Sequence, residues 1–194
     1  MKPSEKRILR KREQILFSAI SIINQRGYDG ATMEDIAADL LMTKSSLYYY
    51  FKSKGDLMYQ CHNFVLSQAV TDLEHDLNAD GTAEEVLRGM ISTHMDYVLD
   101  EKETNNLIIE PHSYFNEEQL EPVLKLRKHY SSLFDKVIEK GISTGEFTVD
   151  KPLVVRMIIL GSTNWTQQWF SPNGKMTKEE LKQDFGDYFL KLLK

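Results

Sequence analysis

The feature of this sequence that most constrains its fold is residues 32–54, which carry the pattern of two short helices joined by a tight turn. Thr32 is placed to cap the first helix, and Asp35, three residues later, is placed to complete a capping box by accepting a hydrogen bond from the Thr32 N–H. Thr43 is placed to cap the second helix, which is too short to be stable in isolation. The pattern therefore predicts a helix-turn-helix that the rest of its domain must hold in place.

The second helix has two different faces. Leu47 and Phe51 are four residues apart and turn one face into the core, while the other carries small polar groups, tyrosines and flanking lysines. After the cap at Thr43, the first backbone N–H groups form a ready anion site. Such a surface suits a helix in the DNA major groove with phosphates on both sides. The alternative is a helical hairpin with half-buried tyrosines and solvated lysines. The residues expected to face DNA are Thr32, Thr43, Lys44, Ser45, Ser46, Tyr48, Tyr49, Tyr50 and Lys54.

A longer segment, from about Ile15 to Leu57, resembles the DNA-binding region of the TetR-type one-component transcriptional regulators. The resemblance implies an all-helical homodimer, a palindromic DNA operator, repression, and a small-molecule ligand that controls release from DNA. The sequence departs from the family at Leu41, where a turn glycine is usual, and at Gly55, where an acidic residue is common. Leu41 requires either a turn without left-handed backbone or a strained leucine. The matching positions are Ile15-Leu16, Gly27-Tyr28, Thr32, Ile36-Ala37, Thr43-Lys44, Leu47-Tyr48-Tyr49-Tyr50-Phe51, Lys54 and Asp56-Leu57.

Charge is divided unevenly along the 194 residues, whose formal net charge is −5. Residues 1–56 hold ten Lys and Arg against seven Asp and Glu, whereas the remainder holds fourteen against twenty-two. The amino-terminal part is therefore basic and suited to nucleic acid, and the rest is acidic. Residues 1–12 indicate either a flexible arm that reaches phosphates or a bare solvated terminus. Their cations, opposed only by Glu5, are Lys2, Lys6, Arg7, Arg10, Lys11 and Arg12.

The chain reads as helices separated by short breaks, with no alternating strand pattern of useful length. We predict an all-α fold of about nine helices, with a helix-turn-helix DNA-binding domain over residues 1–53 and an effector-binding and dimerisation domain over residues 54–194. Capping patterns that begin helices are Thr82 with Glu85, Asn116 with Gln119 and Thr177 with Glu180. The expected helices beyond residue 53 cover about 54–78, 82–99, 106–110, 116–143, 152–169 and 177–193.

The last two expected helices carry more apolar surface than one domain needs. In the first of them Ile158, Gly161, Trp165 and Trp169 share one face, with small residues at 161–163 where another helix can approach closely. The pattern favours a four-helix interface across a two-fold axis over a purely intramolecular core. The residues expected at this dimer interface are Gly161, Ser162, Leu181, Phe185, Tyr188 and Leu192.

The segment from Gly161 to Thr177 is similar to a subset of these regulators that control lipid or sterol breakdown, whose ligands are often acyl-coenzyme A thioesters. Such a ligand needs an apolar tunnel for its chain and cations for its phosphates. Each candidate residue, taken singly, also fits core packing or a solvated charge. The residues proposed to line the tunnel are Tyr97, Tyr130, Phe134, Met157, Trp165 and Trp169, and those proposed to meet anionic groups are Arg88, Arg127 and Arg156.

Other classes of protein find little support in the sequence. The histidines form no i, i+4 pair and have no cysteine partner, no glycine-rich phosphate loop occurs, and no pair of carboxylates is marked as acid and base. We therefore predict no metal, no cofactor and no catalytic residues. The leading alternative to a ligand-responsive repressor is a DNA-binding architectural protein without an effector. The sequence leaves open the operator, the regulated genes and the identity of the effector.

Cys61 is the single cysteine, which excludes an intramolecular disulfide and favours a reducing, cytoplasmic environment. Its helical spacing with Leu57, Phe64 and Val65 predicts a buried thiol, with a redox switch as the alternative. No signal peptide and no run long enough to span a membrane is expected.

Overall fold

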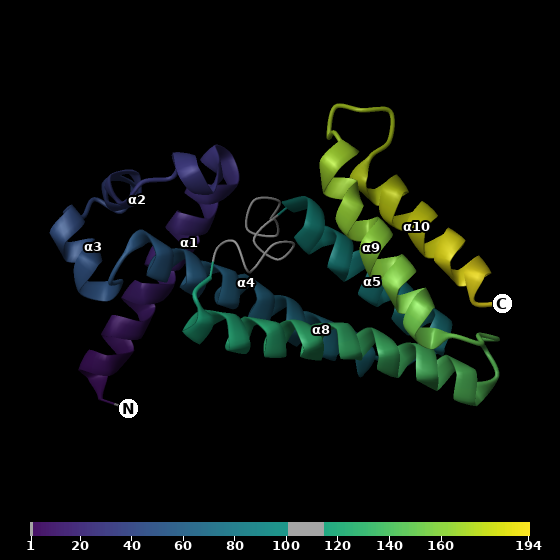
Figure 1. Ribbon diagram of the computed structural model, residues 1–194. Coiled ribbons are helices and arrows are strands. Elements are labelled where there is room, and N and C mark those ends of the chain that lie inside the picture. Colours follow the sequence, from purple (N-terminus) through teal and green to yellow (C-terminus); the bar gives the residue numbers. More distant parts are fainter. Residues whose placement is uncertain (1, 101–114) are drawn as a thin grey trace. The chain divides into compact units, whose positions relative to one another are not determined.

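The computed structural model describes residues 2–100 and 115–194. Over this part of the chain it contains eight helices and no strand (Figure 1), which confirms the predicted all-α class. The predicted helix over residues 106–110 lies outside the described residues. The helices are α1 Pro3–Gly30, α2 Met33–Asp39, α3 Lys44–Tyr50, α4 Lys54–Leu77, α5 Ala83–Asp100, α8 Glu117–Thr144, α9 Pro152–Trp169 and α10 Lys178–Leu192.

The chain divides into two compact units. The first takes in Met1–Leu66 and Glu101–Val123, and the second takes in Ser67–Asp100 and Leu124–Lys194. The helices α4 and α8 contribute residues to both. The expected functional boundary between residues 53 and 54 stays a prediction, because the division into units falls inside α4 instead.

The first unit holds the three helices of the predicted DNA-binding domain around a common core. Leu47 and Phe51 are almost fully buried, as their spacing predicted, so α3 is held by one face only. Helix α1 is interrupted at Gly27, whose backbone has φ 74° and ψ 169°. Further core residues with no exposed surface are Ile15, Ala19, Ile23, Ile36, Leu57 and Cys61.

The predicted caps form as the sequence indicated. Thr32 and Asp35 make a reciprocal capping box at the start of α2, and the Thr43 hydroxyl accepts a hydrogen bond from the Ser46 N–H at 3.1 Å. Such caps satisfy backbone donors that the first helical turn leaves without partners. The same reciprocal pattern joins Thr82 to Glu85, Asn116 to Gln119 and Thr177 to Glu180.

Leu41 in the turn between α2 and α3 adopts the left-handed conformation, with φ 52°. The N–H of Leu41 donates to Ala38 O at 3.0 Å and the N–H of Met42 donates to Ala37 O at 2.8 Å. This pair of bonds is a helix-ending motif that usually employs glycine, because a Cβ atom is strained there. The side chain of Leu41 is 97% exposed, so burial does not offset the strain.

The amino-terminal cations do not form a flexible arm. Helix α1 begins at Pro3, and the Glu5 carboxylate accepts a hydrogen bond from the Lys2 N–H at 2.8 Å. Proline favours the first helical turn, because its fixed φ suits the helix and its missing N–H would have no partner there. The basic run is therefore helical from residue 3 onward, and its side chains project from an ordered backbone.

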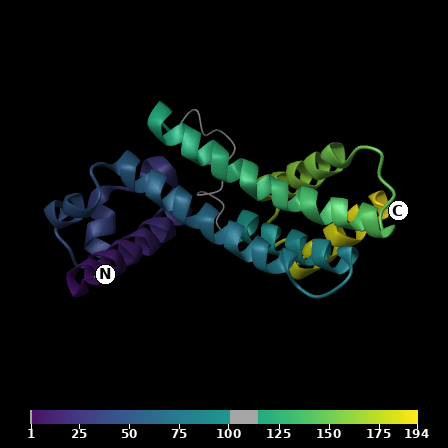
Figure 2. The same ribbon diagram turned by 90° about the horizontal axis from the view of Figure 1, so that it is seen from below.

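The second unit is a helical bundle with a continuous apolar core. Leu87, Met90 and Ile91 of α5 and Phe134 and Ile138 of α8 are fully buried in it. The later parts of α4 and α8 run side by side within this unit (Figures 1 and 2), where His129 Nε2 lies 2.8 Å from Glu74 Oε1.

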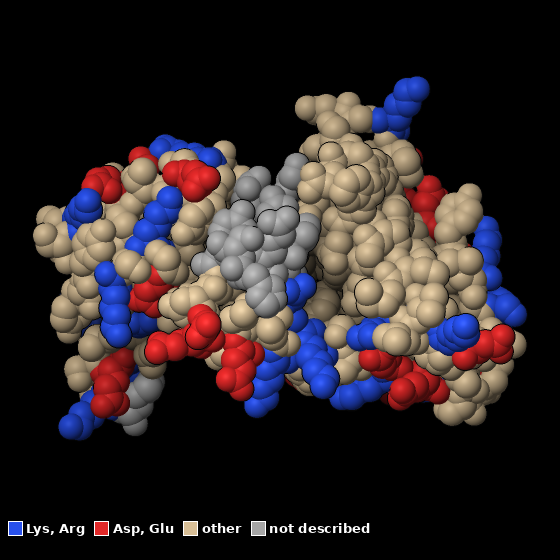
Figure 3. All heavy atoms as spheres, viewed as in Figure 1, with Lys and Arg blue, Asp and Glu red and all other residues tan. Residues whose placement is uncertain are grey.

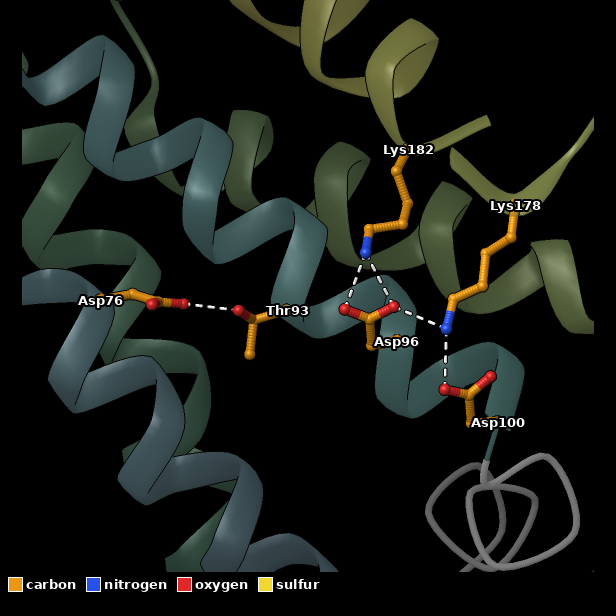
Figure 4. Close-up of polar contacts among 6 residues, drawn as sticks. All are labelled: Asp76, Thr93, Asp96, Asp100, Lys178 and Lys182. Carbon is orange, nitrogen blue, oxygen red and sulfur yellow. Dashed lines mark hydrogen bonds and ion pairs between the residues drawn. The ribbon is translucent and has the colours of Figure 1, made fainter. Parts of the chain in front are cut away.

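A polar cluster ties α10 to the end of α5 in the same unit. Figure 4 shows Lys178 and Lys182 reaching Asp96, at 2.6 and 2.7 Å, and Lys178 also reaching Asp100 at 2.7 Å. Partial burial works to raise the pKa of Asp96, but the hydrogen bonds from the two ammonium groups outweigh it and the pKa is lowered. The cluster holds the first turns of α10 against the end of α5.

Candidate functional site

The exposed face of α3 carries the residues that the sequence assigned to DNA. Tyr49 is 74% exposed and Tyr48 is 42% exposed. The rings of Tyr49 and Tyr50 meet edge to face with centroids 5.1 Å apart, which limits their rotation. Lys44, Ser45 and Ser46 at the start of the helix are all exposed. The opposite face is anchored in the core, so α3 presents a fixed set of donors and aromatic edges.

Two of the residues predicted to contact DNA, Thr32 and Thr43, already use their hydroxyl groups as helix caps within the chain. The Thr32 hydroxyl lies 2.5 Å from Asp35 Oδ2 and accepts from the Asp35 N–H at 3.1 Å. The Thr43 hydroxyl lies 2.8 Å from Ser46 Oγ, in addition to its bond with the Ser46 N–H. Both threonines shape the helix starts, and their assignment to DNA stays a prediction.

Lys44 is paired with Glu34, which projects from the first turn of α2. The hydrogen bond with Lys44 lowers the pKa of Glu34, and the same bond raises the pKa of Lys44. An ammonium group has three donors, so Lys44 can hold Glu34 and still bind a phosphate. The pair sets where the Lys44 ammonium stands above the exposed face of α3.

Lys54 and Arg12 hold the end of the helix-turn-helix. The Lys54 ammonium lies 4.6 Å from the centre of the Tyr28 ring and 3.4 Å from Asp29 O. Arg12 Nη1 donates to Tyr50 O at 2.7 Å, and the guanidinium lies 4.6 Å from the centre of the Phe51 ring. Sequence reasoning placed Arg12 in the basic run and missed this role, because the partners are 38 residues apart.

In the second unit, several of the predicted effector residues come together around a histidine that the sequence did not single out. His94 Nδ1 lies 2.6 Å from the Tyr130 hydroxyl, and the rings of His94 and Phe134 pack edge to face at 5.9 Å. Burial raises the pKa of Tyr130, with a smaller contribution from nearby Tyr97. Arg127 precedes Tyr130 by one turn of α8, and burial lowers its pKa. Tyr97, Arg127, Tyr130 and Phe134 thus share one region.

The other predicted effector residues lie elsewhere. Arg88 is paired with Asp187 at 2.7 Å and lines a pocket of about 600 Å³ between α5 and α10, whose other lining residues include Lys182 and Glu179. Arg156 is paired with Asp135 at 3.1 Å. Two of the three predicted arginines are therefore engaged by carboxylates of their own chain, and their assignment to an effector stays a prediction. Met157, Trp165 and Trp169 are 62%, 66% and 50% exposed, so they lie on the surface of α9 rather than around an internal tunnel.

The predicted dimer residues divide in the same way. Tyr188 and Leu192 of α10 are 66% and 57% exposed, and Gly161 of α9 is exposed as well. Ser162 is half-buried and its hydroxyl donates to Ile158 O in its own helix. Leu181 is only 1% exposed, so it belongs to the core of its own chain, and Phe185 packs on Phe189 at 5.4 Å.

Sequence reasoning also missed part of this surface. Leu153 and Val154 lie on the same helix as Gly161 and are 59% and 48% exposed, beside Ile158 of the predicted face, which is 44% exposed. Figure 3 shows a broad uncharged area over α9. The apolar surface is therefore wider than the six residues assigned to it, and most of it comes from α9.

The ordered helix-turn-helix, with its exposed polar and aromatic reading face, defines a DNA-binding transcriptional regulator. Residues 15–61 match the family of bacterial regulatory proteins named tetR, and residues 80–193 match the tetracyclin repressor-like C-terminal domain. The second match covers more than half of the chain, so the chain belongs to the TetR family of transcriptional repressors. The family consists of regulators rather than enzymes. No helix in the described part of the chain is long and apolar enough to cross a membrane.

Individual relatives agree with this assignment. The chain is similar to the fatty acid metabolism regulator protein of Bacillus subtilis (strain 168), with 26% identity over 157 residues, or 79% of each protein. A TetR/AcrR-family regulator from Thermobifida fusca YX-ER1 has 25% identity and a TM-score of 0.80, over 93% of this chain and 96% of that one. AibR, solved with isovaleryl coenzyme A and operator DNA, has 23% identity and a TM-score of 0.77, over 94% of this chain and 97% of that one.

Proposed function

We propose that the protein is a homodimeric repressor that binds a palindromic operator through α3 and releases it when an acyl-coenzyme A thioester binds the second unit. The observation that carries the DNA-binding part is the exposed face of α3, where Tyr49 and Lys44 project from a helix anchored by Leu47 and Phe51. Side chains in such a position can reach base edges and phosphates once the helix enters the major groove.

A homodimer is supported by the uncharged surface of α9. Trp165, Met157 and Leu153 are each more than half exposed, and Tyr188 adds to them from α10. Large contiguous apolar surface marks an interaction site in a water-soluble chain. A second copy of the same face would cover it by a two-fold operation. Two copies of α3 spaced about 34–36 Å apart would then fit half-sites one DNA turn apart.

An acyl-coenzyme A effector is supported by the relatives and by the region around Tyr130. The Bacillus subtilis relative is a regulator of fatty acid metabolism, and AibR was solved with an acyl-coenzyme A. In this chain Tyr97, Tyr130 and Phe134 supply aromatic surface, and Arg127 supplies a cation that no described residue pairs. Such a combination suits an apolar chain that ends in an anionic carrier.

The proposed mechanism is a shift between two states of the dimer. The empty dimer would hold its two reading helices at the spacing of the operator. Effector binding would favour a second state in which that spacing is lost, and α4, which contributes residues to both units, would carry the change. To act as a switch, the effector must prefer the second state by about 1–3 kcal/mol.

Binding to genomic DNA fragments, followed by footprinting, tests the proposal. We expect protection of an inverted repeat and loss of that protection when an acyl-coenzyme A is added at a concentration above its Kd. The same ligand should raise the melting temperature of the free protein, because it binds the folded chain only. Protection that persists at every acyl-coenzyme A concentration, without thermal stabilisation, would contradict the proposed effector. The protein would then be a DNA-binding protein that responds to another class of effector or to none.

A further inference from the structure

The His94 imidazole is buried with one nitrogen satisfied and the other unused. Its side chain is 4% exposed, and Nδ1 lies 2.6 Å from the Tyr130 hydroxyl. Nε2 has no hydrogen-bond partner among the described residues. A buried polar group without a partner costs about 1–3 kcal/mol, so an orphan nitrogen in the core of a small unit calls for a partner.

The hydrogen bonds available to His94 and Tyr130 determine which imidazole nitrogen of His94 carries the hydrogen. If Nδ1 carried the proton and donated to Tyr130, the hydroxyl hydrogen of Tyr130 would lack an acceptor in the described structure, and Nε2 would lack a donor. If Tyr130 donates to Nδ1, only one group is left unsatisfied, an Nε2–H donor. Burial lowers the pKa of His94 to about 4, so this donor is neutral at physiological pH.

The surroundings of the donor limit what it can bind. Phe134 packs against the imidazole and against Tyr130, so the pair has an apolar aromatic neighbour. Arg127 and Tyr130 are only half-buried, so the hydrogen-bonded pair of His94 and Tyr130 is not fully enclosed within its unit. A neutral donor in an apolar setting suits an uncharged carbonyl better than a carboxylate. The free energy needed to remove water from a carboxylate is larger than one hydrogen bond from a neutral donor can offset. Arg127 stands one helical turn before Tyr130 on α8 and is half-buried, so its cation could meet an anionic part of the same molecule.

We propose that His94 Nε2 donates a hydrogen bond to the thioester carbonyl of the effector, with Tyr130 fixing the tautomer that makes this possible. The inference rests on the proposed acyl-coenzyme A effector and deepens it, because it names the group that distinguishes a thioester from other ligands with the same chain. Tyr130 is a positioning residue in this arrangement, and His94 is the recognition residue.

The test compares acyl-coenzyme A with S-alkyl-coenzyme A, a thioether that keeps the chain and the carrier but lacks the carbonyl. Calorimetry on the full-length protein would measure Kd for matched pairs of chain length from butanoyl to octadecanoyl. We expect the wild type to prefer the thioester by about threefold to tenfold, the range of one hydrogen bond. His94→Phe should abolish that preference, and His94→Gln, which keeps an N–H donor, should retain it. His75→Phe, at a histidine whose side chain is 88% exposed in the same unit, is the matched control and should change nothing.

The outcomes distinguish the proposed role of His94 from the proposed effector class. Equal affinity of the wild type for thioester and thioether would overturn the role of His94 and leave the effector class standing. Absence of binding to every pair would overturn the effector class, and this inference with it. A readout that needs no variant is nuclear magnetic resonance of isotope-labelled histidine. It should show the Nε2–H tautomer of His94 in the free protein and a shift of that nitrogen on addition of thioester only, whereas an Nδ1–H tautomer would contradict the proposal.

Discussion

Arg12 of α1 closes the carboxyl end of the reading helix by donating a 2.7 Å hydrogen bond to Tyr50 O, while its guanidinium lies over the Phe51 ring. The last carbonyls of a helix have no partners within it, and a cation there also meets the negative end of the helix dipole. One side chain therefore fixes the end of α3 without occupying the face that α3 presents.

Replacing Arg12 should weaken operator binding through loss of structure. We expect Arg12→Met to lower the free energy of unfolding by about 1–3 kcal/mol, because a charged hydrogen bond to a backbone carbonyl is lost. Denaturant unfolding and operator affinity would be measured together. Arg10→Met is the control, since Arg10 is exposed and forms no ion pair or hydrogen bond in the described structure. Equal unfolding free energies for the two variants would contradict this role of Arg12.

Tyr49 and Lys44 should affect DNA binding in different ways. Tyr49→Ala should reduce operator affinity about tenfold, because a contact at the base edges is lost, with little change for random DNA. Lys44→Ala should reduce affinity for all sequences and lower the slope of log affinity against log salt by about 0.9 if one phosphate contact is lost. Effector binding should be unchanged in both. Operator affinity equal to wild type in both variants would refute the assignment of α3.

Glu34 provides an internal check on Lys44. In Lys44→Ala the Glu34 carboxylate is left without its cation beside the expected phosphate path, so its repulsion adds to the loss. The double variant Glu34→Gln with Lys44→Ala should therefore bind DNA more tightly than Lys44→Ala alone. The same affinity for single and double variants would place Glu34 away from the DNA.

Leu41 should be a site where the protein can be stabilised. Glycine or asparagine accepts the left-handed conformation more readily than leucine, and little burial is lost because Leu41 is 97% exposed. We expect Leu41→Asn to raise the free energy of unfolding by about 1 kcal/mol and the melting temperature by a few degrees. Leu41→Ala keeps a strained Cβ and serves as the control, with no comparable gain. A melting temperature for Leu41→Asn at or below that of Leu41→Ala would show that the turn is not strained.

The α9 surface should control oligomeric state. Met157→Glu with Ile158→Glu introduces charges into the uncharged area without touching the core, since both side chains are more than two-fifths exposed. We expect the double variant to sediment as a monomer and to lose most operator affinity, because one reading helix binds weakly. The control is a pair of glutamates at exposed Ser67 and Gln68 of α4. A dimer that survives the α9 changes would move the interface elsewhere.

His94 should make stability fall under mildly acidic conditions. Its pKa is about 4 when folded and about 6.5 when unfolded, so protons bind the unfolded chain more tightly. Stability is therefore intact above about pH 6.5 and is lost as the pH falls towards 4, by up to about 1.4 kcal/mol per pH unit. Unfolding measured from pH 7 to pH 4 should show a shallower decline for His94→Gln than for the wild type. Parallel curves would mean that His94 is not the group responsible.

Much of the fold could be predicted because the residues that begin a helix lie close together in the sequence. Thr32, Thr82 and Thr177 each stand three residues before an acidic side chain, and such caps are read from a short stretch of sequence. For Leu41 the sequence left two alternatives, a turn without left-handed backbone or a strained leucine, and the structure shows the strained leucine. For the amino-terminal cations the sequence left open a flexible arm or a bare solvated terminus, because charge alone does not distinguish the two, whereas the structure begins a helix at Pro3 with Glu5 in its first turn.

The candidate sites were harder to predict because they join distant parts of the chain. Arg12 meets Tyr50 across 38 residues, and His94 meets Tyr130 across 36, and no periodicity marks either pair. The amphipathic pattern of α9 indicated an apolar face but not what covers it. Trp165 could therefore be assigned to a tunnel with the same logic that assigned Gly161 to an interface, and exposure was needed to separate them.

The position of the tryptophans has a practical consequence. The chain has two, Trp165 and Trp169, and both lie on the exposed side of α9. Their emission therefore reports on that side alone, since the helix-turn-helix has no tryptophan to add background. In the proposed homodimer these two residues lie where the copies meet, so association should shift the fluorescence emission of the native protein to the blue, without any attached dye.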